Sequence, residues 1–181
     1  MRSYLLNIFL FAFCWVCLPL AAQNMASIEA PMGLSFVYGF DYHHAWYTQL
    51  KPTVGFDATI GLGGNNKRTE LQYAFIVEQR YYYNMLRRQT KGKNTLNKSA
   101  DYFSVKPAYT YTHVNSEYEI TGKNRYGYHT YYCTVNWGMR RAMGKRFYFD
   151  GSIGIGPGYH SYARNAEAML DLNVSIGFKL F

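Results

Sequence analysis

The stretch LDLNVSIGFKLF, residues 170–181, alternates between apolar and polar side chains almost without a break. Successive side chains on a β-strand point to opposite faces of the sheet, so this pattern predicts one strand with an apolar face and a polar face. Its apolar face carries Leu170, Leu172, Val174, Ile176, Phe178 and Leu180.

The same alternation recurs along the chain, and the intervening segments are rich in turn residues. These strands are longer than the ~5–6 residues usual in soluble sheets and suit the ~9–11 residues that cross a bilayer at a tilt. A barrel made by one chain closes with an even number of strands, which requires an eighth. The segment 24–30 is the favoured candidate for that strand, and 116–121 is the alternative. The six further predicted strands are 33–42, 48–62, 69–85, 102–114, 128–140 and 147–158.

The polar face of these strands carries many glycines and charges of both signs, whereas no acidic residue falls on the apolar face. A narrow barrel interior favours small residues, and buried charges must pair. The sequence therefore predicts an all-β, antiparallel, up-and-down transmembrane barrel with its apolar face toward lipid. Pro107 interrupts one strand and predicts a β-bulge. The predicted interior charge network is Asp41, Asp57, Glu70, Glu78, Arg80, Lys106, Arg140, Asp150, Asp171 and Lys179.

The first residues predict an address outside the cytoplasm. Arg2 precedes a long apolar run that Pro19 interrupts, and Ala21 and Ala22 precede Gln23. We expect residues 1–22 to be a cleaved signal peptide and residues 23–181 to form one barrel domain. The alternative is a retained membrane anchor. The high aromatic content, 19% of the chain, is natural for a barrel with aromatic girdles at both interfaces.

Eight strands in a chain of this size resemble the small OmpA-like barrel class. The segments EQRYYYNMLRRQTKGKN (78–94), NKSADYF (97–103) and WGMRRAMGKRF (137–147) are similar to a family of short outer-membrane barrel proteins of Bacteroidetes. The resemblance implies a porin-like barrel of the Gram-negative outer membrane, but the family brings no established activity. A last strand ending at Phe181 also resembles the signal by which assembly machinery recognises such barrels.

Counting strands back from the last one places segments 43–46, 87–99 and 142–146 on the periplasmic side, and 63–68, 115–127 and 159–167 outside. Two of the periplasmic segments are basic. The sequence favours a solvated rim that anchors the barrel at headgroup level and leaves open an anionic partner such as lipid phosphate, lipopolysaccharide or peptidoglycan. Nucleic acid is not expected as a partner. The basic rim consists of Arg87, Arg88, Lys91, Lys93, Arg141, Lys145 and Arg146.

The sequence predicts no catalytic, cofactor-binding or metal-binding residues. The histidines are adjacent or isolated and lack the spacing of a zinc site. His160 and Ser161 invite comparison with lipid A deacylases, whose motif is His-x-Ser-Asn, but here the two residues are adjacent and point to opposite faces. Cys133 shares parity with lipid-facing residues and is expected to be inert.

We therefore expect a non-enzymatic outer-membrane barrel with a polar interior filled by side chains, in a structural or surface-binding role. Two alternatives stay open: a lipid A deacylase-like enzyme in the same scaffold, and a soluble periplasmic carrier of the lipocalin type with its apolar face inward. The sequence does not define the oligomeric state.

Overall fold

The computed structural model describes residues 25–30, 34–43, 45–60, 67–118 and 122–180, although the side chains at several strand ends within these ranges are not described. Eight strands account for most of this part of the chain, and one short α-helix and one 3₁₀ turn lie between the fourth and fifth strands. The elements are β1 (Met25–Ala30), β2 (Leu34–His43), β3 (Trp46–Ile60), β4 (Lys67–Tyr81), α2 (Met85–Thr90), η1 (Leu96–Lys98), β5 (Asp101–Tyr118), β6 (Gly122–Met143), β7 (Phe147–His160) and β8 (Asn165–Lys179).

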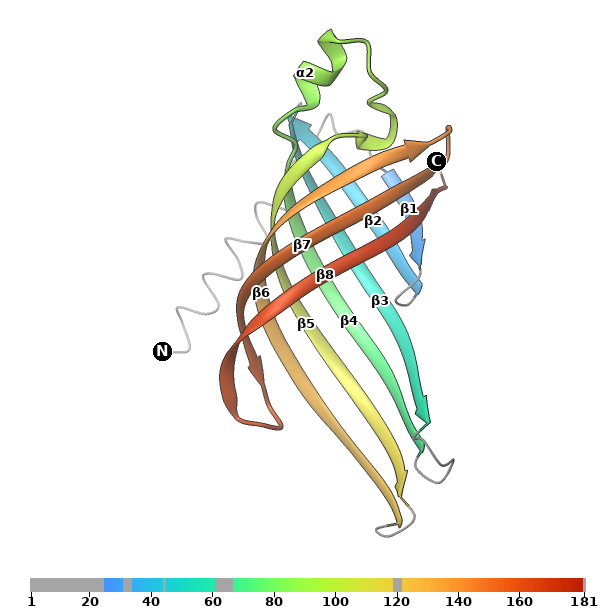
Figure 1. Cartoon of the computed structure of the whole chain (residues 1–181), viewed down its shortest axis with the longest axis vertical. Coiled ribbons are helices and arrows are strands. Elements are labelled where there is room, and N and C mark those ends of the chain that lie inside the picture. Colours follow the sequence, from blue (N-terminus) through green and yellow to red (C-terminus); the bar gives the residue numbers. More distant parts are fainter. Residues whose placement is uncertain (1–24, 31–33, 44, 61–66, 119–121, 181) are drawn as a thin grey trace.

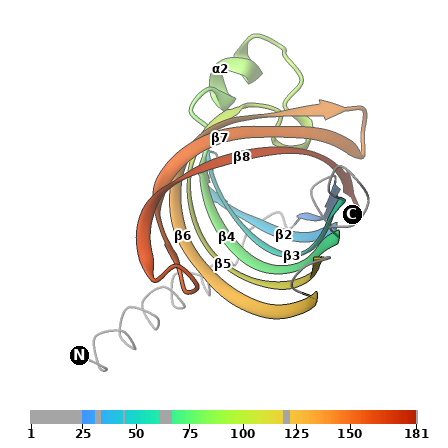
Figure 2. The same ribbon diagram turned by 60° about the horizontal axis from the view of Figure 1, so that its bottom comes forward.

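Each strand pairs in antiparallel fashion with the next along the chain, and β1 pairs with β8, so that the sheet closes into a barrel (Figures 1 and 2). The predicted eight-stranded antiparallel barrel is confirmed. The strand missing from the clear sequence pattern is β1, in the favoured segment 24–30. The alternative segment, 116–121, does not supply the eighth strand in the described residues. Residues 116–118 are the end of β5, and residues 119–121 lie outside the described part.

Several predicted boundaries are wrong. The connection expected at 115–127 is mostly strand, because β5 and β6 stay paired as far as Tyr118 and Gly122. Backbone pairing continues there although the apolar alternation has ended. The loop expected at 87–99 contains most of α2 and all of η1. A six-residue helix is too short to show helical periodicity in the sequence, which is why that pattern did not predict it.

The bulge expected at Pro107 is also absent from the described pairing. Pro107 pairs with Cys133 in β6, and the register with β4 is the same on both sides of it, from Ile76 opposite Ala108 to Gln79 opposite Val105. Proline lacks the N–H that a ladder needs. Here the missing donor interrupts the pairs with β4 without inserting a residue. The irregularity that the structure does show lies between Asp41 and His43, where β2 pairs with β3.

The strands differ in length, which leaves the ring incompletely paired at one end. Among the described residues, β1 pairs with β8 only from Ile176 to Lys179, and β2 pairs with β3 only as far as Val54. Residues 165–175 of β8 and 55–60 of β3 therefore have no described strand on their outer edges. We call this region between the two edges the seam. Below β8, Figure 1 shows β3 to β6 continuing past the ends of β1 and β2.

Large apolar side chains cover the outer face of the barrel. Leu34, Val135, Ile155 and Leu170 are each more than half exposed. Aromatic rings of neighbouring strands meet on this face in the pairs Trp46–Tyr81 and Tyr109–Tyr131, whose centroids are 4.9 and 5.2 Å apart. Tyr83, just after β4, meets Phe103 of β5 at 5.2 Å. Most of the apolar residues predicted on one face of each strand are therefore exposed where their side chains are described, and Phe40 is an exception because it is buried. The free Cys133 is exposed with them.

The predicted signal peptide, residues 1–22, lies outside the described residues, so the cleavage and domain assignments stay predictions. In the described part of the chain, no helix has the length and apolar character needed to cross a membrane.

Candidate functional site in the barrel interior

The barrel interior holds two arginines around one aspartate. Asp150 on β7 is fully buried and accepts hydrogen bonds from Arg80 Nη1 on β4 at 2.5 Å and from Arg140 Nε on β6 at 2.6 Å. β4 and β7 are not neighbours in the sheet, so the Arg80–Asp150 bond crosses the interior. Both guanidinium groups are buried as completely as the aspartate. Charges in such surroundings persist only when they are paired and hydrogen-bonded.

Two glutamates extend this centre toward β1 and β3. Glu78 accepts from Arg80 at 2.9 Å and from Gln49 Nε2 at 2.5 Å. Glu29 on β1 forms an ion pair with Lys51 and lies 3.5 Å from Arg140 Nη2. Three carboxylates thus face three cationic side chains, so the buried charges balance.

Tyrosines enclose the arginines and link the carboxylates. The Arg80 guanidinium lies over the Tyr102 ring at 4.1 Å, and that of Arg140 lies over Tyr148 at 4.3 Å. The hydroxyl of Tyr102 donates to Asp150 at 2.7 Å, and that of Tyr148 donates to Glu29 at 2.9 Å. Cation–π contact and a charge-assisted hydrogen bond therefore act through the same rings. We call Glu29, Gln49, Lys51, Glu78, Arg80, Tyr102, Arg140, Tyr148 and Asp150 the charge network.

Glycines on the neighbouring strands make room for these rings. Tyr102 lies opposite Gly138, and Tyr148 lies opposite Gly177. A Cβ atom at either glycine would overlap the tyrosine ring. At these two positions, glycine is required because a specific aromatic ring approaches the backbone closely. This reason is more specific than the predicted need for small residues in a narrow interior.

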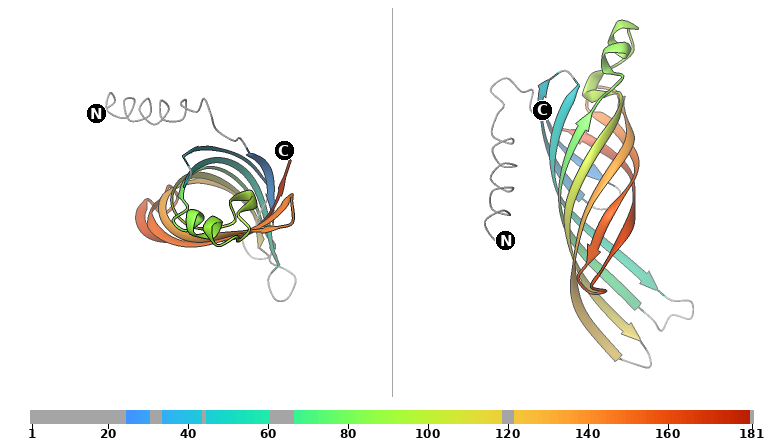
Figure 3. Two further views of the ribbon diagram at one scale, coloured as in Figure 1. Left: turned by 90° about the horizontal axis from the view of Figure 1, so that it is seen from above. Right: turned by 90° about the vertical axis from the view of Figure 1, so that its left-hand side faces the viewer.

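A segment between β4 and β5 lies across one end of the barrel (Figure 3, left). Tyr82, Met85 and Ala100 from this segment are buried against the network tyrosines. Burial raises the pKa of the Tyr82 phenol, an effect that the nearby arginines oppose. Asn97 Nδ2 donates to the carbonyl of Lys145 at 3.1 Å, which ties the segment to the β6–β7 turn. We call this the closed end.

The remaining predicted interior charges lie outside the centre. Lys106 and Asp171 form an ion pair, and Asp41 pairs with Lys98 at 2.6 Å near the closed end. Glu70 lies on β4 and is partly buried, and it belongs to none of the contacts described above. Lys179 is half-buried at the end of β8, where its backbone N–H donates to the carbonyl of Arg146. Asp57 lies on β3, but its side chain is outside the described part.

Several network members were not predicted from the sequence. Gln49 and Lys51 share the parity of the predicted inner face of β3, and Tyr102 and Tyr148 share that of β5 and β7. Extending each alternation to the strand end would have found these residues. Glu29 had no such signal, because β1 is short and was itself uncertain.

The predicted basic rim lies at the closed end. Most of its side chains are exposed, whereas Arg88 donates to the carbonyl of Asn94 at 3.2 Å and Arg141 forms an ion pair with Asp101. The exposed members are Arg87, Lys91, Lys93, Lys145 and Arg146.

The structure does not bring His160 and Ser161 into a catalytic pair. The Ser161 hydroxyl accepts the backbone N–H of His129 at 2.8 Å. The His160 ring bonds the Thr130 hydroxyl through Nδ1 at 3.0 Å, and its Nε2 lies 3.3 Å from Glu167. The expectation that His160 and Ser161 do not form a deacylase-like pair agrees with these contacts, and the enzyme alternative itself stays untested.

No protein-family model matches the sequence. No curated protein matches it either. Among solved structures, the crystal structure of CarO2 from Acinetobacter baumannii aligns with 87% of this chain and 99% of that one, at a TM-score of 0.48 and 11% sequence identity. The account of the fold therefore rests on the strand pairing of this chain, and the resemblance to Bacteroidetes barrels stays a prediction.

Proposed function

We propose that this chain is a non-enzymatic outer-membrane β-barrel whose polar interior is filled by side chains, and that it has a structural or surface-binding role. The supporting observation is the inverted distribution of side chains. The buried set is dominated by polar and charged residues, while large apolar residues dominate the exposed set.

A soluble barrel of the lipocalin type needs the opposite arrangement. Exposed apolar patches larger than a few hundred Å² are rare on soluble monomers, whereas this chain exposes apolar residues on every strand from β1 to β8. A bilayer removes that cost, since an outward apolar band flanked by aromatic girdles is the surface that lipid requires. The inversion thus supports a membrane barrel over a soluble carrier.

The interior does not suit a diffusion pore. Eight strands enclose a space that side chains fill. Here Tyr47, Tyr102, Tyr148 and the two arginines occupy it at the closed end, and the segment between β4 and β5, which contributes Tyr82, lies above them. We therefore propose a barrel that holds its surface in the membrane and leaves binding to its rims, with the basic rim meeting anionic lipid phosphates on the periplasmic side.

The membrane placement is tested with arginine substitutions. Val135→Arg on the outer face should lower the free energy of unfolding in lipid vesicles by roughly 2–4 kcal/mol, the cost of an arginine near the midplane. Tyr162→Arg, in the exposed β7–β8 turn, is the matched control and should have little effect. The wild type should also migrate differently on a gel when it is unheated. A mature chain that stays monodisperse in buffer without detergent would overturn the proposal.

Two further measurements address sidedness and activity. In a Cys133→Ser background, a cysteine at Ala163 should react with an impermeant label on intact cells, and one at Asn94 should react only after the outer membrane is opened. The reverse result would invert the proposed orientation. Lipid A mass spectra should be the same with and without the protein, and altered acyl chains would favour the enzyme alternative.

A further inference from the structure

We propose that the closed-end segment, residues 82–100, binds peptidoglycan through the carboxylates of that polymer. This inference rests on the membrane placement and sidedness proposed above. It goes beyond them because it divides the basic rim into cations at headgroup level and cations that stand clear of the bilayer.

The closed-end segment carries positive charge and no negative charge. Its cationic residues are Arg87, Arg88, Lys91, Lys93 and Lys98, and it contains neither aspartate nor glutamate. Lys98 pairs with Asp41, and Arg88 donates to a backbone carbonyl of the segment. Arg87, Lys91 and Lys93 are exposed and have no ion-pair partner in the part of the chain that the structure describes. These three cations are therefore available to an anionic partner.

The local backbone fixes where these cations lie. Arg87 and Lys91 are four residues apart along α2, so they share one face of the helix. Gly92 then adopts a positive φ of 63°. The N–H groups of Gly92 and Lys93 donate to carbonyls of the last helical turn at 3.0 and 2.9 Å. This is the Schellman arrangement that ends a helix, and it holds Lys93 beside that turn.

Both ends of the segment are fastened to the barrel. At its start, Asn84 Nδ2 donates to the Asp101 carboxylate at 2.5 Å, and the Asp101 N–H donates to Asn84 Oδ1 at 2.9 Å. Met85 is buried against the network tyrosines, and Asn97 is tied to the β6–β7 turn. A surface that is already held in place loses little conformational freedom on binding, so its cations are preorganised.

The position of α2 directs these cations away from lipid. Figures 1 and 3 show α2 beyond the strand ends and, seen from above, within the outline of the strands. Headgroups surround the barrel laterally, so α2 faces the periplasm. The β6–β7 turn differs, because its cations Lys145 and Arg146 lie between the exposed apolar side chains of Met143 and Phe147. That turn suits headgroups, whereas α2 suits a partner beneath the membrane.

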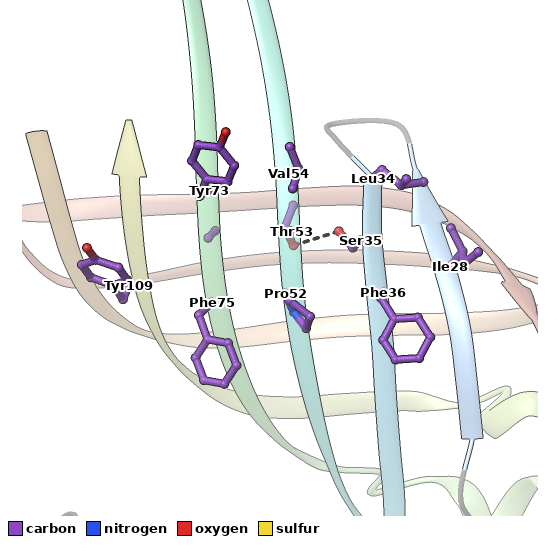
Figure 4. Close-up of a pocket in the computed structure, with 11 residues that line it drawn as sticks. Ile28, Leu34, Ser35, Phe36, Pro52, Thr53, Val54, Tyr73, Phe75 and Tyr109 are labelled. Carbon is purple, nitrogen blue, oxygen red and sulfur yellow. Dashed lines mark hydrogen bonds between the residues drawn. The ribbon is translucent and has the colours of Figure 1, made fainter. Parts of the chain in front are cut away.

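The outer wall shows which side chains this chain presents to lipid. A groove of about 620 Å³ on this wall is lined by 11 residues, none of which is charged (Figure 4). Apolar side chains such as Phe36, Val54 and Phe75 dominate it. Residues 87–94 have the opposite character, because they include no apolar side chain. This contrast also separates α2 from the lipid-facing surface.

Polyvalency selects the partner. A single exposed ion pair contributes little in water, so three separate cations retain a partner well only when it offers several anions at once. Peptidoglycan is such a polymer in the periplasm, because its peptides repeat carboxylates along the network. A folded protein is a weaker candidate, because protein interfaces centre on desolvated, well-packed anchors and residues 87–94 present none.

The test is co-sedimentation of the folded mature protein, in mild detergent and at low ionic strength, with purified peptidoglycan sacculi. The wild type should sediment with the sacculi, and Lys91→Gln with Lys93→Gln should weaken binding roughly fivefold. Arg125→Gln with Arg164→Gln is the matched control, because it removes the same charge from exposed positions at the other end of the barrel. The control should bind as the wild type does. Equal binding by the wild type and the Lys91 and Lys93 variant, or an equal loss in the control, would overturn the inference.

Two further arms identify the chemistry. Sacculi whose carboxyl groups have been amidated should not bind the wild type, and continued binding would contradict carboxylate recognition. Retention of phosphatidylglycerol from nanodiscs, measured by native mass spectrometry, should fall in Lys145→Gln with Arg146→Gln and stay unchanged in Lys91→Gln with Lys93→Gln. The reverse would assign the α2 cations to lipid and overturn the inference.

Heat-modifiable migration of each variant shows that it has folded. A chain that inserts into membranes but does not sediment with sacculi overturns this inference alone, whereas failure to insert overturns the proposed function. Labelling of a cysteine at Asn94 on intact cells would overturn both the proposed orientation and this inference.

Discussion

The closed end and the seam are opposite solutions to the same problem of placing polar groups inside a narrow β-barrel. Toward the closed end β1 pairs with both β2 and β8, which closes the sheet, and the charges of Arg80, Arg140 and Asp150 neutralise one another within hydrogen-bond distance. At the seam the described strand pairing stops, and the charged pairs line a cavity. The barrel therefore concentrates rigidity at one end and leaves accessible polar surface at the other.

The energetic consequence follows from burial. Asp150 is inaccessible to solvent, whereas the Asp171 side chain keeps 14% of its exposure. Charge interactions strengthen as water is excluded, and so does the cost of leaving one charge unpaired. Matched substitutions at the two ends should therefore differ in size although the chemistry is the same.

The largest difference is expected for the carboxylates. Asp150→Asn leaves two buried arginines without their shared counter-charge and should reduce the free energy of unfolding by about 3–5 kcal/mol. Asp171→Asn, which removes the partner of Lys106 at the seam, should reduce it by less, about 1–3 kcal/mol, because this pair keeps some contact with solvent. Urea unfolding of the protein refolded in lipid vesicles measures both. Equal losses would show that the two ends are equally desolvated.

Removing one hydroxyl gives a smaller contrast. Tyr102→Phe keeps the ring over Arg80 but removes the hydrogen bond to Asp150, and it should reduce the free energy of unfolding by about 1.5–3 kcal/mol, the range for bonds to charged groups. Tyr132→Phe, at the polar cavity beside the seam, removes a hydrogen bond to the neutral Thr110 and should reduce it by about 0.5–1.5 kcal/mol. The same unfolding assay compares them. A larger loss for Tyr132→Phe would place the more rigid polar contacts at the seam.

A single added methyl group compares packing at the two ends. In Gly177→Ala the new Cβ meets the Tyr148 ring, which Ser27 and Glu29 hold by hydrogen bonds, so we expect a loss of about 1–3 kcal/mol. In Gly158→Ala it meets the end of Met169, a flexible side chain that can move aside, so the loss should be smaller. Melting temperatures in vesicles are sufficient to rank the two. If Gly158→Ala is the more damaging, the seam is packed as tightly as the closed end.

The fold could be predicted from the sequence because alternation is local. Each of the seven clear strands shows its own period of two, and parity alone then required β1. The extension of β5 and β6 past the apolar band could not be predicted in the same way, since backbone pairing depends on a partner strand and leaves no hydrophobic pattern. Helix α2 was missed because six residues are too few to establish a helical period.

The candidate site was predictable only in part. Parity identified Glu78, Arg80, Arg140 and Asp150 as sharing the polar face, but which of them meet depends on the stagger of the strands around the barrel. Glu29 was not predicted because it lies on β1, the strand whose apolar–polar alternation is weakest. The seam could not be predicted from the sequence either. Its position depends on where strand pairing ends between segments that are distant in the sequence.

The smallest effect is expected at the tether between the closed-end segment and β2. Lys98 pairs with Asp41 at 2.6 Å, with both side chains partly exposed, so Lys98→Met should reduce the free energy of unfolding by about 1 kcal/mol or less. Lys98 also has a positive φ of 60°. Lys98→Gly removes the same charge but relieves that backbone strain, and it should therefore be no more damaging than Lys98→Met.

Salt separates this tether from the charge network. Raising the ionic strength to about 1 M shortens the screening length to about 3 Å and should remove most of the effect of Lys98→Met on unfolding. The loss caused by Asp150→Asn should persist, because solvent ions do not enter the buried pair. If both losses vanish in salt, the interior of the closed end is open to solvent. If both persist, the tether is more deeply desolvated than its exposure indicates. If salt removes the effect of Lys98→Met but not that of Asp150→Asn, the stability of the closed end comes mainly from the buried charges inside the barrel.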